Sequence, residues 1–381
     1  MSFFDNHSNW PLVTLKDIAT LKRGYDLPTK NRVEGDVPIY AANGINGSHN
    51  EVKIKGPGVI TGRSGTIGKV HFTEQDYWPL NTSLYVTDFH GNDPKWVFYM
   101  LRAFQLERYV EGAGVPTLNR NLVHDELVPL PPLAEQKRIA AILDKADAIR
   151  QKRKQAIDLA DEFLRSVFLD MFGDPVTNPK GWEERKLISG LSKVQSGWSA
   201  NGESYPCTSN EFGVLKVSAV TSGYFKEYEN KFVPREKIPE GKRLLFPKRG
   251  DLLFSRANTR ELVAATCIVT RDHDNVFLPD KLWKIELNES LLPEFLHMLI
   301  QQPRFKDKLT SQATGSSGSM LNISKSKFEQ TKAIFPSITE QIKFKEIYWK
   351  VTKSLTLIEA SQAKSDDFFN SLSQKAFSGQ L

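Results

Sequence analysis

The chain has 381 residues, of which 40% are hydrophobic and 25% charged, and its formal net charge is +6. At roughly 100–200 residues per domain this length predicts two or three domains, and the ordinary globular composition excludes a wholly disordered chain. The N-terminus lacks the basic start and apolar run of a signal peptide, and no stretch of about 18 apolar residues occurs. We therefore expect a cytoplasmic protein whose basic charge suits a polyanion such as nucleic acid.

The sequence repeats itself once along its length. The runs Pro131-Pro132-Leu133-Ala134-Glu135-Gln136 and Pro336-Ser337-Ile338-Thr339-Glu340-Gln341 each open a long helical pattern. Three further matches occur in the same order: Trp10 and Leu15 with Trp182 and Leu187, Gly58-Val59-Ile60 and Arg63 with Asp251-Leu252-Leu253 and Arg256, and Leu118-Asn119 with Leu321-Asn322. Each match is weak by itself, but their common order predicts two tandem copies of one unit.

Each copy ends in a predicted long helix, at about 133–172 and about 338–377. Apolar or small residues recur in alternating steps of three and four, apart from Arg153 in the first helix and Gln362 and Ser365 in the second. This is the period of a coiled coil. The recurring residues are Ile139, Ile142, Ala146, Ile149, Ala156, Ala160, Phe163 and Val167 in the first helix and Tyr348, Val351, Leu355, Ile358, Phe369 and Leu372 in the second. We expect these two seams to pair in an antiparallel coiled coil. The alternative is that each stripe packs on the domain that precedes it.

The segments before the helices show a different pattern. Short apolar runs at 58–60, 84–86, 252–254 and 263–269 are separated by Gly, Pro and Asn clusters, which predicts strands joined by irregular loops. Short helices are predicted near 96–106 and 292–299. The fold class is therefore α+β. We expect domains at 1–130 and 174–335, with spacer helices at 131–173 and 336–381.

Three runs resemble one known family, the specificity subunits of type I restriction–modification enzymes. They are MFGDPVTNPKGW at 171–182, PPLAEQKRIAAIL at 131–143 and GRSGTIGKV at 62–70, and the two-copy layout is similar to the family along the whole chain. The resemblance implies that each domain is a target recognition domain that reads one half of a bipartite double-stranded DNA target. The helices would space the domains and dock partners, although SITEQIKFKEIY in the second copy departs from PLAEQKRIAAIL in the first.

The same resemblance implies the partners and their cofactors. We expect two methyltransferase subunits and, for cleavage, two restriction subunits. S-adenosylmethionine, ATP and Mg would bind those partners and not this chain.

Enzymatic motifs are incomplete in this sequence. The run Arg63–Val70 lacks the first glycine and the final hydroxyl of a P-loop. Asp174 with Glu184 and Lys186 would suit a nuclease, but Asp174 falls in the run that resembles a linker. The cofactor turn and the Asn/Asp-Pro-Pro-aromatic loop of an adenine methyltransferase do not occur.

Metal-ligand spacing is missing as well. The seven histidines form no cluster, and Cys207 and Cys267 are interpreted as two buried thiols. We expect no catalytic residue and no metal site in this chain.

Recognition chemistry remains. Base edges are read by Asn, Gln, Arg, Lys, Ser and Thr on positioned loops, and phosphates by Lys, Arg and small polar residues. The candidate DNA-binding residues are Asn43, Asn46, Ser48, Arg63, Ser64, Thr66, Lys69, Asn119 and Arg120 in the first copy and Arg256, Asn258, Thr259, Arg260, Asn322 and Lys325 in the second, whose cluster extends over 315–322 and to Lys327. The alternative is that these loops are only solvated. The basic run Arg150–Lys154 would touch the DNA between the half-sites, or form a solvated or partner-binding helix face.

Three other functions stay open. The same fold would serve a methylation-only or bifunctional restriction–modification system. A self-contained DNA-modifying or DNA-cutting enzyme would show activity as a single chain. A coiled-coil interaction protein would have no DNA role, against which the basic charge and the Asn- and Arg-containing loops argue.

Overall fold

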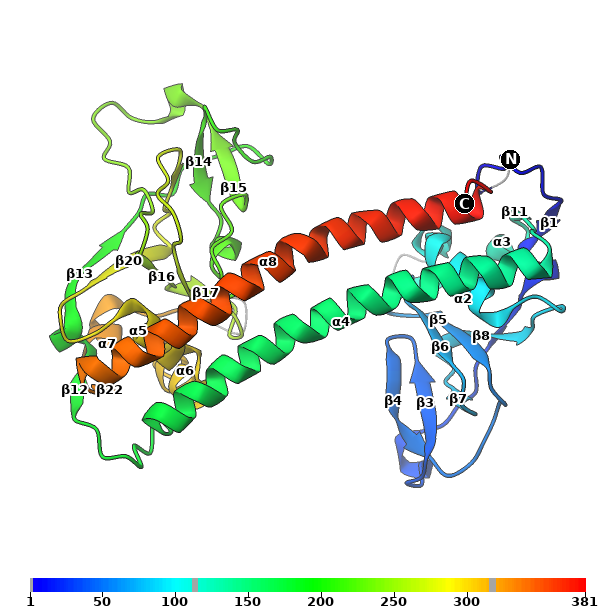
Figure 1. Ribbon diagram of the computed structural model, residues 1–381, viewed down its shortest axis with the longest axis horizontal. Coiled ribbons are helices and arrows are strands. Elements are labelled where there is room, and N and C mark those ends of the chain that lie inside the picture. The colour runs from blue at the N-terminus through cyan, green and yellow to red at the C-terminus, as the bar shows by residue number, and fades with distance from the viewer. Residues whose placement is uncertain (1–2, 112–115, 315–319) are drawn as a thin grey trace. The chain divides into compact units, whose positions relative to one another are not determined.

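A computed structural model of the chain describes residues 3–111, 116–314 and 320–381. The chain divides into two compact units, residues 1–155 with 358–381 and residues 156–357. Each unit combines a mixed domain with parts of two 40-residue helices, α4 (Leu133–Phe172) and α8 (Ile338–Phe377) (Figure 1). The α+β class and both long helices are thus confirmed. No helix in the described part of the chain has a stretch apolar and long enough to cross a membrane.

The first unit is built on a four-stranded sheet with the order β2-β8-β5-β6 and a three-stranded sheet with the order β4-β3-β7. All neighbours in the larger sheet are antiparallel, whereas β3 and β7 are parallel. The elements before α4 are β1 (Leu12–Thr14), α1 (Leu15–Ile18), β2 (Thr20–Arg23), η1 (Thr29–Asn31), β3 (Val37–Ala41), β4 (Gly44–His49), β5 (Gly58–Gly62), β6 (Val70–Thr73), β7 (Trp78–Pro79), β8 (Ser83–Asp88), α2 (Pro94–Ala103), η2 (Leu106–Tyr109), β9 (Val110–Glu111), β10 (Thr117–Leu118), α3 (Arg120–His124) and β11 (Leu127–Pro129).

The second unit has the same two sheets, ordered β13-β20-β16-β18 and β15-β14-β19. Its elements between α4 and α8 are β12 (Glu184–Lys186), η3 (Leu187–Gly190), β13 (Leu191–Ser196), β14 (Phe212–Leu215), η4 (Val217–Ala219), β15 (Asn230–Val233), η5 (Arg235–Lys237), β16 (Leu252–Ser255), β17 (Ala257–Asn258), β18 (Thr266–Ile268), β19 (Val276–Phe277), β20 (Leu282–Leu287), α5 (Pro293–Gln301), α6 (Pro303–Thr310), β21 (Leu321–Asn322), α7 (Lys325–Gln330) and β22 (Lys332–Ile334). Since even the parallel pair recurs as β14 with β19, the tandem repeat is a repeat of topology.

Two repeated sequence signals have clear structural causes. Gln136 and Gln341 are both buried, and each side-chain amide donates to the carbonyl of the proline five positions earlier, at 3.0 and 2.9 Å. Each side-chain oxygen accepts the backbone N–H of the residue that precedes a domain helix, Asp93 before α2 and Leu292 before α5, both at 2.9 Å. The glutamine therefore ties the start of each long helix to the start of a domain helix, and it satisfies a backbone donor that the helix leaves unpaired.

The repeated tryptophans belong to a second device. Asn6 and Asn178 each close a small ring with the tryptophan four positions later: the asparagine amide donates to the carbonyl of Trp10 or Trp182 at 2.7 Å, and the tryptophan N–H returns to the asparagine oxygen at 3.0 or 2.9 Å. The indole N–H of Trp182 also donates to the carbonyl of Phe172 at 2.9 Å. The run after α4 is therefore an ordered connection.

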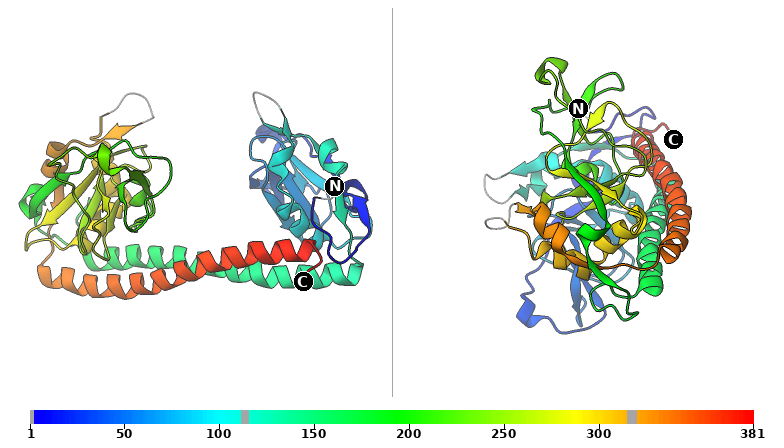
Figure 2. Two further views of the ribbon diagram at one scale, coloured as in Figure 1. Left: turned by 90° about the horizontal axis from the view of Figure 1, so that it is seen from above. Right: turned by 90° about the vertical axis from the view of Figure 1, so that its left-hand side faces the viewer.

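The long helices run antiparallel. In the first unit, Ile139 and Leu143 near the start of α4 belong to the same core as Phe369 and Phe377 near the end of α8. In the second unit the order is reversed, since the end of α4 shares a core with the start of α8. The buried residues there are Leu164, Phe168, Phe172, Phe344 and Tyr348. Within each unit the sheets lie on one side of the helix segments (Figure 2).

The predicted seam of α4 is wrong at several positions. Ile149 and Phe163 are each 51% exposed, and Ile142 is only half-buried, whereas Leu143 is fully buried. The buried side of α4 packs against both α8 and the preceding domain. The alternative that each apolar stripe packs on its preceding domain is therefore confirmed in part. It also carries the buried Asp147, a position that a search for apolar periodicity passes over.

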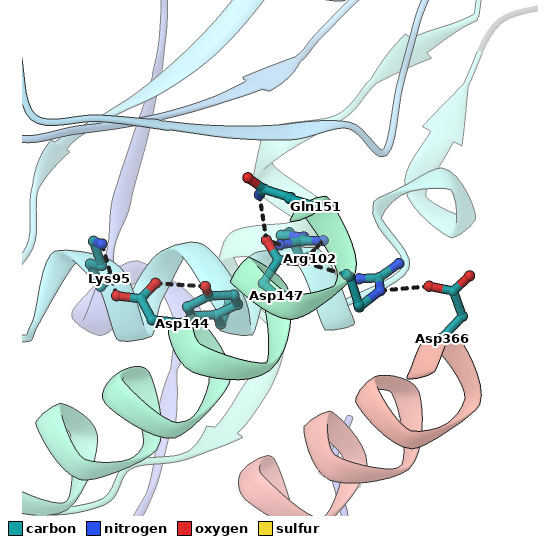
Figure 3. A network of polar contacts seen from close by, with 8 residues as sticks. Lys95, Arg102, Asp144, Asp147, Gln151 and Asp366 are labelled. Atoms are coloured by element: carbon teal, nitrogen blue, oxygen red, sulfur yellow. Dashed lines mark hydrogen bonds and ion pairs between the residues drawn. The ribbon is translucent and has the colours of Figure 1, made fainter. Parts of the chain in front are cut away.

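Charged side chains fix α4 to α2 and α8 in the first unit (Figure 3). The carboxylate of Asp147 accepts from Arg102 and Arg150, both at 3.1 Å, and from Gln151 at 3.0 Å. Arg150 also donates to Asp366 of α8 at 2.6 Å. Because a buried carboxylate is costly unless it is paired, this network specifies which side of α4 faces α2.

The basic run in the middle of α4 therefore has a structural role at two positions. Arg150 lies in the network described above, and Arg153 donates to the carbonyl of Ser361 at 3.1 Å. Between Arg150 and Arg153, Gln151 and Lys152 are exposed. The expectation of a purely solvated face is therefore wrong for the two arginines, whereas a DNA contact of this run stays a prediction.

We expect the corrected packing to show in stability. Leu143→Ala removes a fully buried side chain and should lower the free energy of unfolding by about 2–5 kcal/mol. Ile149→Ala changes an exposed side chain and should stay within about 0.5 kcal/mol. Urea denaturation of both variants checks this, and equal losses would restore the predicted seam.

A buried histidine predicts pH-dependent stability in the second unit. The His297 ring lies 2.8 Å from the hydroxyl of Thr266, and burial, followed by the charge of Arg165, lowers the pKa of His297 to about 4. Below its ordinary pKa of 6.5 the unfolded chain binds a proton that the folded chain refuses, so stability falls as pH decreases from 6.5 towards 4. Between pH 7 and 5 we expect His297 to contribute a loss of about 2 kcal/mol.

Urea denaturation of wild type and His297→Gln at the two pH values measures that contribution. The exposed His7 supplies the matched control, since His7→Gln should keep the wild-type pH dependence. An unchanged pH dependence in His297→Gln would contradict the assignment.

Candidate nucleic-acid interface

Arg63 and Arg256 occupy equivalent positions, one residue beyond the central strands β5 and β16. The backbone N–H of Arg63 donates to Thr82 at 2.9 Å, and that of Arg256 donates to Lys281 at 3.1 Å. Both arginine carbonyls accept an N–H at 2.8 Å, from Leu118 and from Ile323. The two strand ends are therefore the same site built twice.

This geometry corrects one predicted match. Leu118 corresponds to Ile323, and not to Leu321, because these two residues bind the equivalent arginine carbonyls. Asn119 accordingly corresponds to Ser324: each caps the following helix, α3 or α7, through its side-chain oxygen. Sequence similarity selected the wrong register because the pair Leu321-Asn322, which matches Leu118-Asn119 by residue type, lies two residues before the structurally equivalent pair.

In the first unit the glycine-rich loop after β5 is fixed by hydrogen bonds. The carbonyl of Lys69 accepts from the hydroxyl of Thr61 at 3.0 Å, Ser64 forms a β-bridge with Thr117, and Thr66 is half-buried in the loop. The Lys69 ammonium donates to the side chain of Asn43 at 2.6 Å. The structure thus brings Asn43, the loop and the strand of Thr117 together.

Other first-unit candidates lie apart from that loop or support the fold. Asn46 is exposed on β4, where Arg32 donates to its carbonyl at 2.9 Å, and Ser48 is half-buried in the same strand. Asn119 donates to Glu111 at 2.8 Å in addition to capping α3. Arg120 is exposed and reaches the carbonyl of Leu21 at 3.5 Å.

In the second unit the half-buried side chain of Arg256 is held by several hydrogen bonds. It donates to the carbonyl of Asp280 at 2.8 Å, to the Asp280 carboxylate at 3.1 Å and to Asn322 at 3.0 Å. Asp280 also accepts from Ser199, and both Ser199 and the guanidinium lower the pKa of the Asp280 carboxyl. Arg256 therefore joins three loops, which is a positioning role that the sequence did not reveal.

The remaining second-unit candidates surround that arginine. Asn258 and Thr259 are half-buried in a turn where the Asn258 side chain accepts the Thr259 N–H at 2.9 Å. Arg260 is exposed, and Lys325 is an exposed residue at the start of α7, 3.7 Å from Glu329. Residues 315–319 of the predicted cluster lie outside the described residues, and Lys327 donates to the carbonyl of Gln312.

A groove of about 910 Å³ lies beside the first-unit loop. Asn43, Lys69 and His71 line it together with Lys154 of α4. Burial, followed by the nearby Lys69 charge, lowers the pKa of His71, so the ring is neutral near pH 7. Lys69 and Lys154 are exposed and supply positive charge at this groove.

The carboxylate that suggested a nuclease has partners within the second unit. Asp174 is engaged by Arg304 at 2.8 Å and by the N–H groups of Val176 and Thr177. Within the described ranges, no group of three or more His, Cys, Asp and Glu side chains is arranged to hold a metal ion. Cys267 is buried, but Cys207 is only half-buried, which corrects that expectation.

Comparison with known proteins adds sequence relationships. The family described as type I restriction modification DNA specificity domain matches residues 7–159. The type I restriction enzyme EcoEI specificity subunit of Escherichia coli is 26% identical over 171 residues, which cover 44% of this chain and 28% of that protein. The EcoKI specificity subunit of Escherichia coli strain K12 is 25% identical over 279 residues, covering 67% and 57%. The matched regions thus span less than two thirds of either relative.

A third relative and a solved structure match nearly the whole chain. A putative type I restriction enzyme specificity subunit of Haemophilus influenzae is 22% identical over 390 residues, covering 92% of this chain and 91% of that protein. The crystal structure of the type I restriction–modification system S subunit from M. genitalium has the same fold, with a TM-score of 0.62, 16% identity, and coverage of 98% and 97%. Residues 7–159 thus match the DNA specificity domain of type I restriction–modification systems, and the whole chain is similar in sequence and fold to specificity subunits of such systems.

Proposed function

We propose that each domain binds one half of a bipartite double-stranded DNA target and that the chain supplies sequence specificity without catalysing any reaction. The observation that carries this proposal is the strand-end site at Arg63 and its duplicate at Arg256, each at the meeting point of polar loops. One binding site per domain suits a target with two separately read halves. Loops rich in Asn, Ser, Thr, Arg and Lys offer the groups that bind base edges and phosphates.

The proposed partners are two methyltransferase subunits and, for restriction, two restriction subunits, and the similarity to type I specificity subunits supports the kinds of partner. S-adenosylmethionine, ATP and Mg would bind those subunits. A methylation-only or bifunctional system would use the same chain without a separate restriction subunit, and the genes next to this one distinguish the two cases. A coiled-coil interaction protein without a DNA role would need neither the strand-end site at Arg63 nor the one at Arg256.

A domain exchange tests the proposal. Replacing residues near 11–130 by those of another specificity subunit should change one half of the methylated target and leave the other half intact, because each domain has its own site. Sequencing of methylated bases in cells that carry the partner subunits gives the readout.

Two results would overturn the proposal. One is a target that forms a single continuous short motif, or that changes in both halves after the exchange. The other is methylation or cleavage by the purified chain without partners, which would favour a self-contained enzyme.

Substitutions at Arg256 and Arg260 should distinguish a residue that positions loops from a residue that contacts DNA. Arg256→Ala removes one hydrogen-bond partner from each of Asp280 and Asn322 and should cost about 1–2 kcal/mol of stability as well as DNA affinity. Arg260→Ala removes an exposed side chain, so stability should stay within about 0.5 kcal/mol while DNA affinity falls. Urea denaturation and duplex binding by the assembled complex measure both effects, and unaltered affinity in Arg260→Ala would remove that residue from the interface.

A further inference from the structure

A glycine–aromatic pair follows the first strand of the large sheet in both units. Gly24 and Tyr25 follow β2, and Gly197 and Trp198 follow β13. The backbone N–H of Tyr25 donates to the carbonyl of Pro79 at 2.8 Å, and the backbone N–H of Trp198 donates to the carbonyl of Leu278 at 2.9 Å. A side chain on either glycine would collide with backbone, since an added Cβ would lie 2.2 Å from the Leu80 oxygen or 1.8 Å from the Leu278 oxygen. The position of each aromatic ring is therefore fixed by the sheet.

A lysine lies over each of these rings. The Lys53 ammonium is 4.7 Å from the centre of the Tyr25 ring and 5.1 Å from that of Trp78, and the Lys242 ammonium is 5.2 Å from that of Trp198. Both lysines are exposed and both come from the loop that enters the central strand, β4 to β5 or β15 to β16. These loops differ in length, so sequence alignment does not pair the two lysines.

Both lysines adjoin the strand-end arginine sites. In the second unit Ser199 follows Trp198 and binds Asp280, which binds Arg256. In the first unit Asn81 donates its N–H to the carbonyl of Tyr25 at 2.9 Å, and its neighbour Thr82 accepts from Arg63. The same lysine–aromatic pair thus borders the same site twice.

The two ammonium groups are positioned but not neutralised. Among the residues that the structure describes, no carboxylate lies within 4.0 Å of either one. An exposed cation–π contact contributes about 0.5–1 kcal/mol, which restrains a flexible lysine without cancelling its charge. A restrained free cation beside loops that bind DNA suits a phosphate oxygen.

We propose that Lys53 and Lys242 are equivalent phosphate contacts, one for each half of the DNA target. The proposal rests on the DNA-binding function proposed above. Phosphate contacts carry no base information, and each one releases condensed counterions from the duplex. The pair would therefore add affinity and orientation to both half-sites and leave the recognised sequence to other residues.

The test uses the chain assembled with its methyltransferase partner. Affinities of Lys53→Gln, Lys242→Gln and the double variant are measured for a target duplex and an unrelated duplex over a range of salt concentrations. Each single change should weaken binding to both duplexes by the same factor and reduce the slope of log affinity against log salt by about 0.9. The double variant should add the two effects, Lys53→Arg should retain affinity, and the methylated sequence should not change.

Lys55→Gln and Lys248→Gln are matched controls, because these exposed lysines lie in the same two loops and neither lies over an aromatic ring of the described part of the chain. They should lower affinity and slope less than the proposed contacts do. Equal effects in controls and test variants, an unchanged salt slope, altered base preference, or loss of methyltransferase binding would each overturn the assignment. Absence of any preference for the target in the wild-type complex would instead contradict the proposed function, so the two failures are distinguishable.

Discussion

Two buried glutamines each connect the start of a long helix to the start of a domain helix, and the rest of the unit depends on this connection. Gln136 and Gln341 sit in the first turns of α4 and α8 and bind the backbone at the starts of α2 and α5. Removal of either glutamine side chain would leave a backbone N–H donor unpaired, and the unit would lose about 1–3 kcal/mol of stability for each such donor. The glutamine therefore fixes the angle at which a long helix leaves its domain, and the Pro-x-x-x-Glu-Gln signal repeats because this junction is built twice.

The two junctions are reinforced by different chemistry. In the first unit Lys95 and Tyr99 of α2 bind Asp144 of α4 at 2.8 and 2.6 Å. In the second unit the buried Glu294 of α5 accepts the indole N–H of Trp349 at 2.6 Å. Since the carboxylate lies on the long helix in one unit and on the domain helix in the other, exchange of the helix starts would leave the buried Glu294 without its indole donor.

The candidate DNA-binding residues are positioned at strand ends by the sheets and not by any one motif. Arg63 and Arg256 share backbone partners, yet the Arg256 side chain is bound by Asp280 and Asn322. The duplicate units have therefore kept the frame of the site while they changed its side chains. Such divergence within a common frame is what two separately read half-sites would require.

The sequence by itself determined the tandem repeat, the α+β class and both long helices, because periodicity, capping and turn residues act locally. Tertiary structure decided that Leu143 and Asp147 face the core while Ile149 is exposed, since α4 packs against two neighbours and a single apolar period cannot show both. It also decided that Leu118 corresponds to Ile323 and that Lys53 corresponds to Lys242. Those equivalences depend on strand register and on loops of unequal length, and linear spacing carries neither.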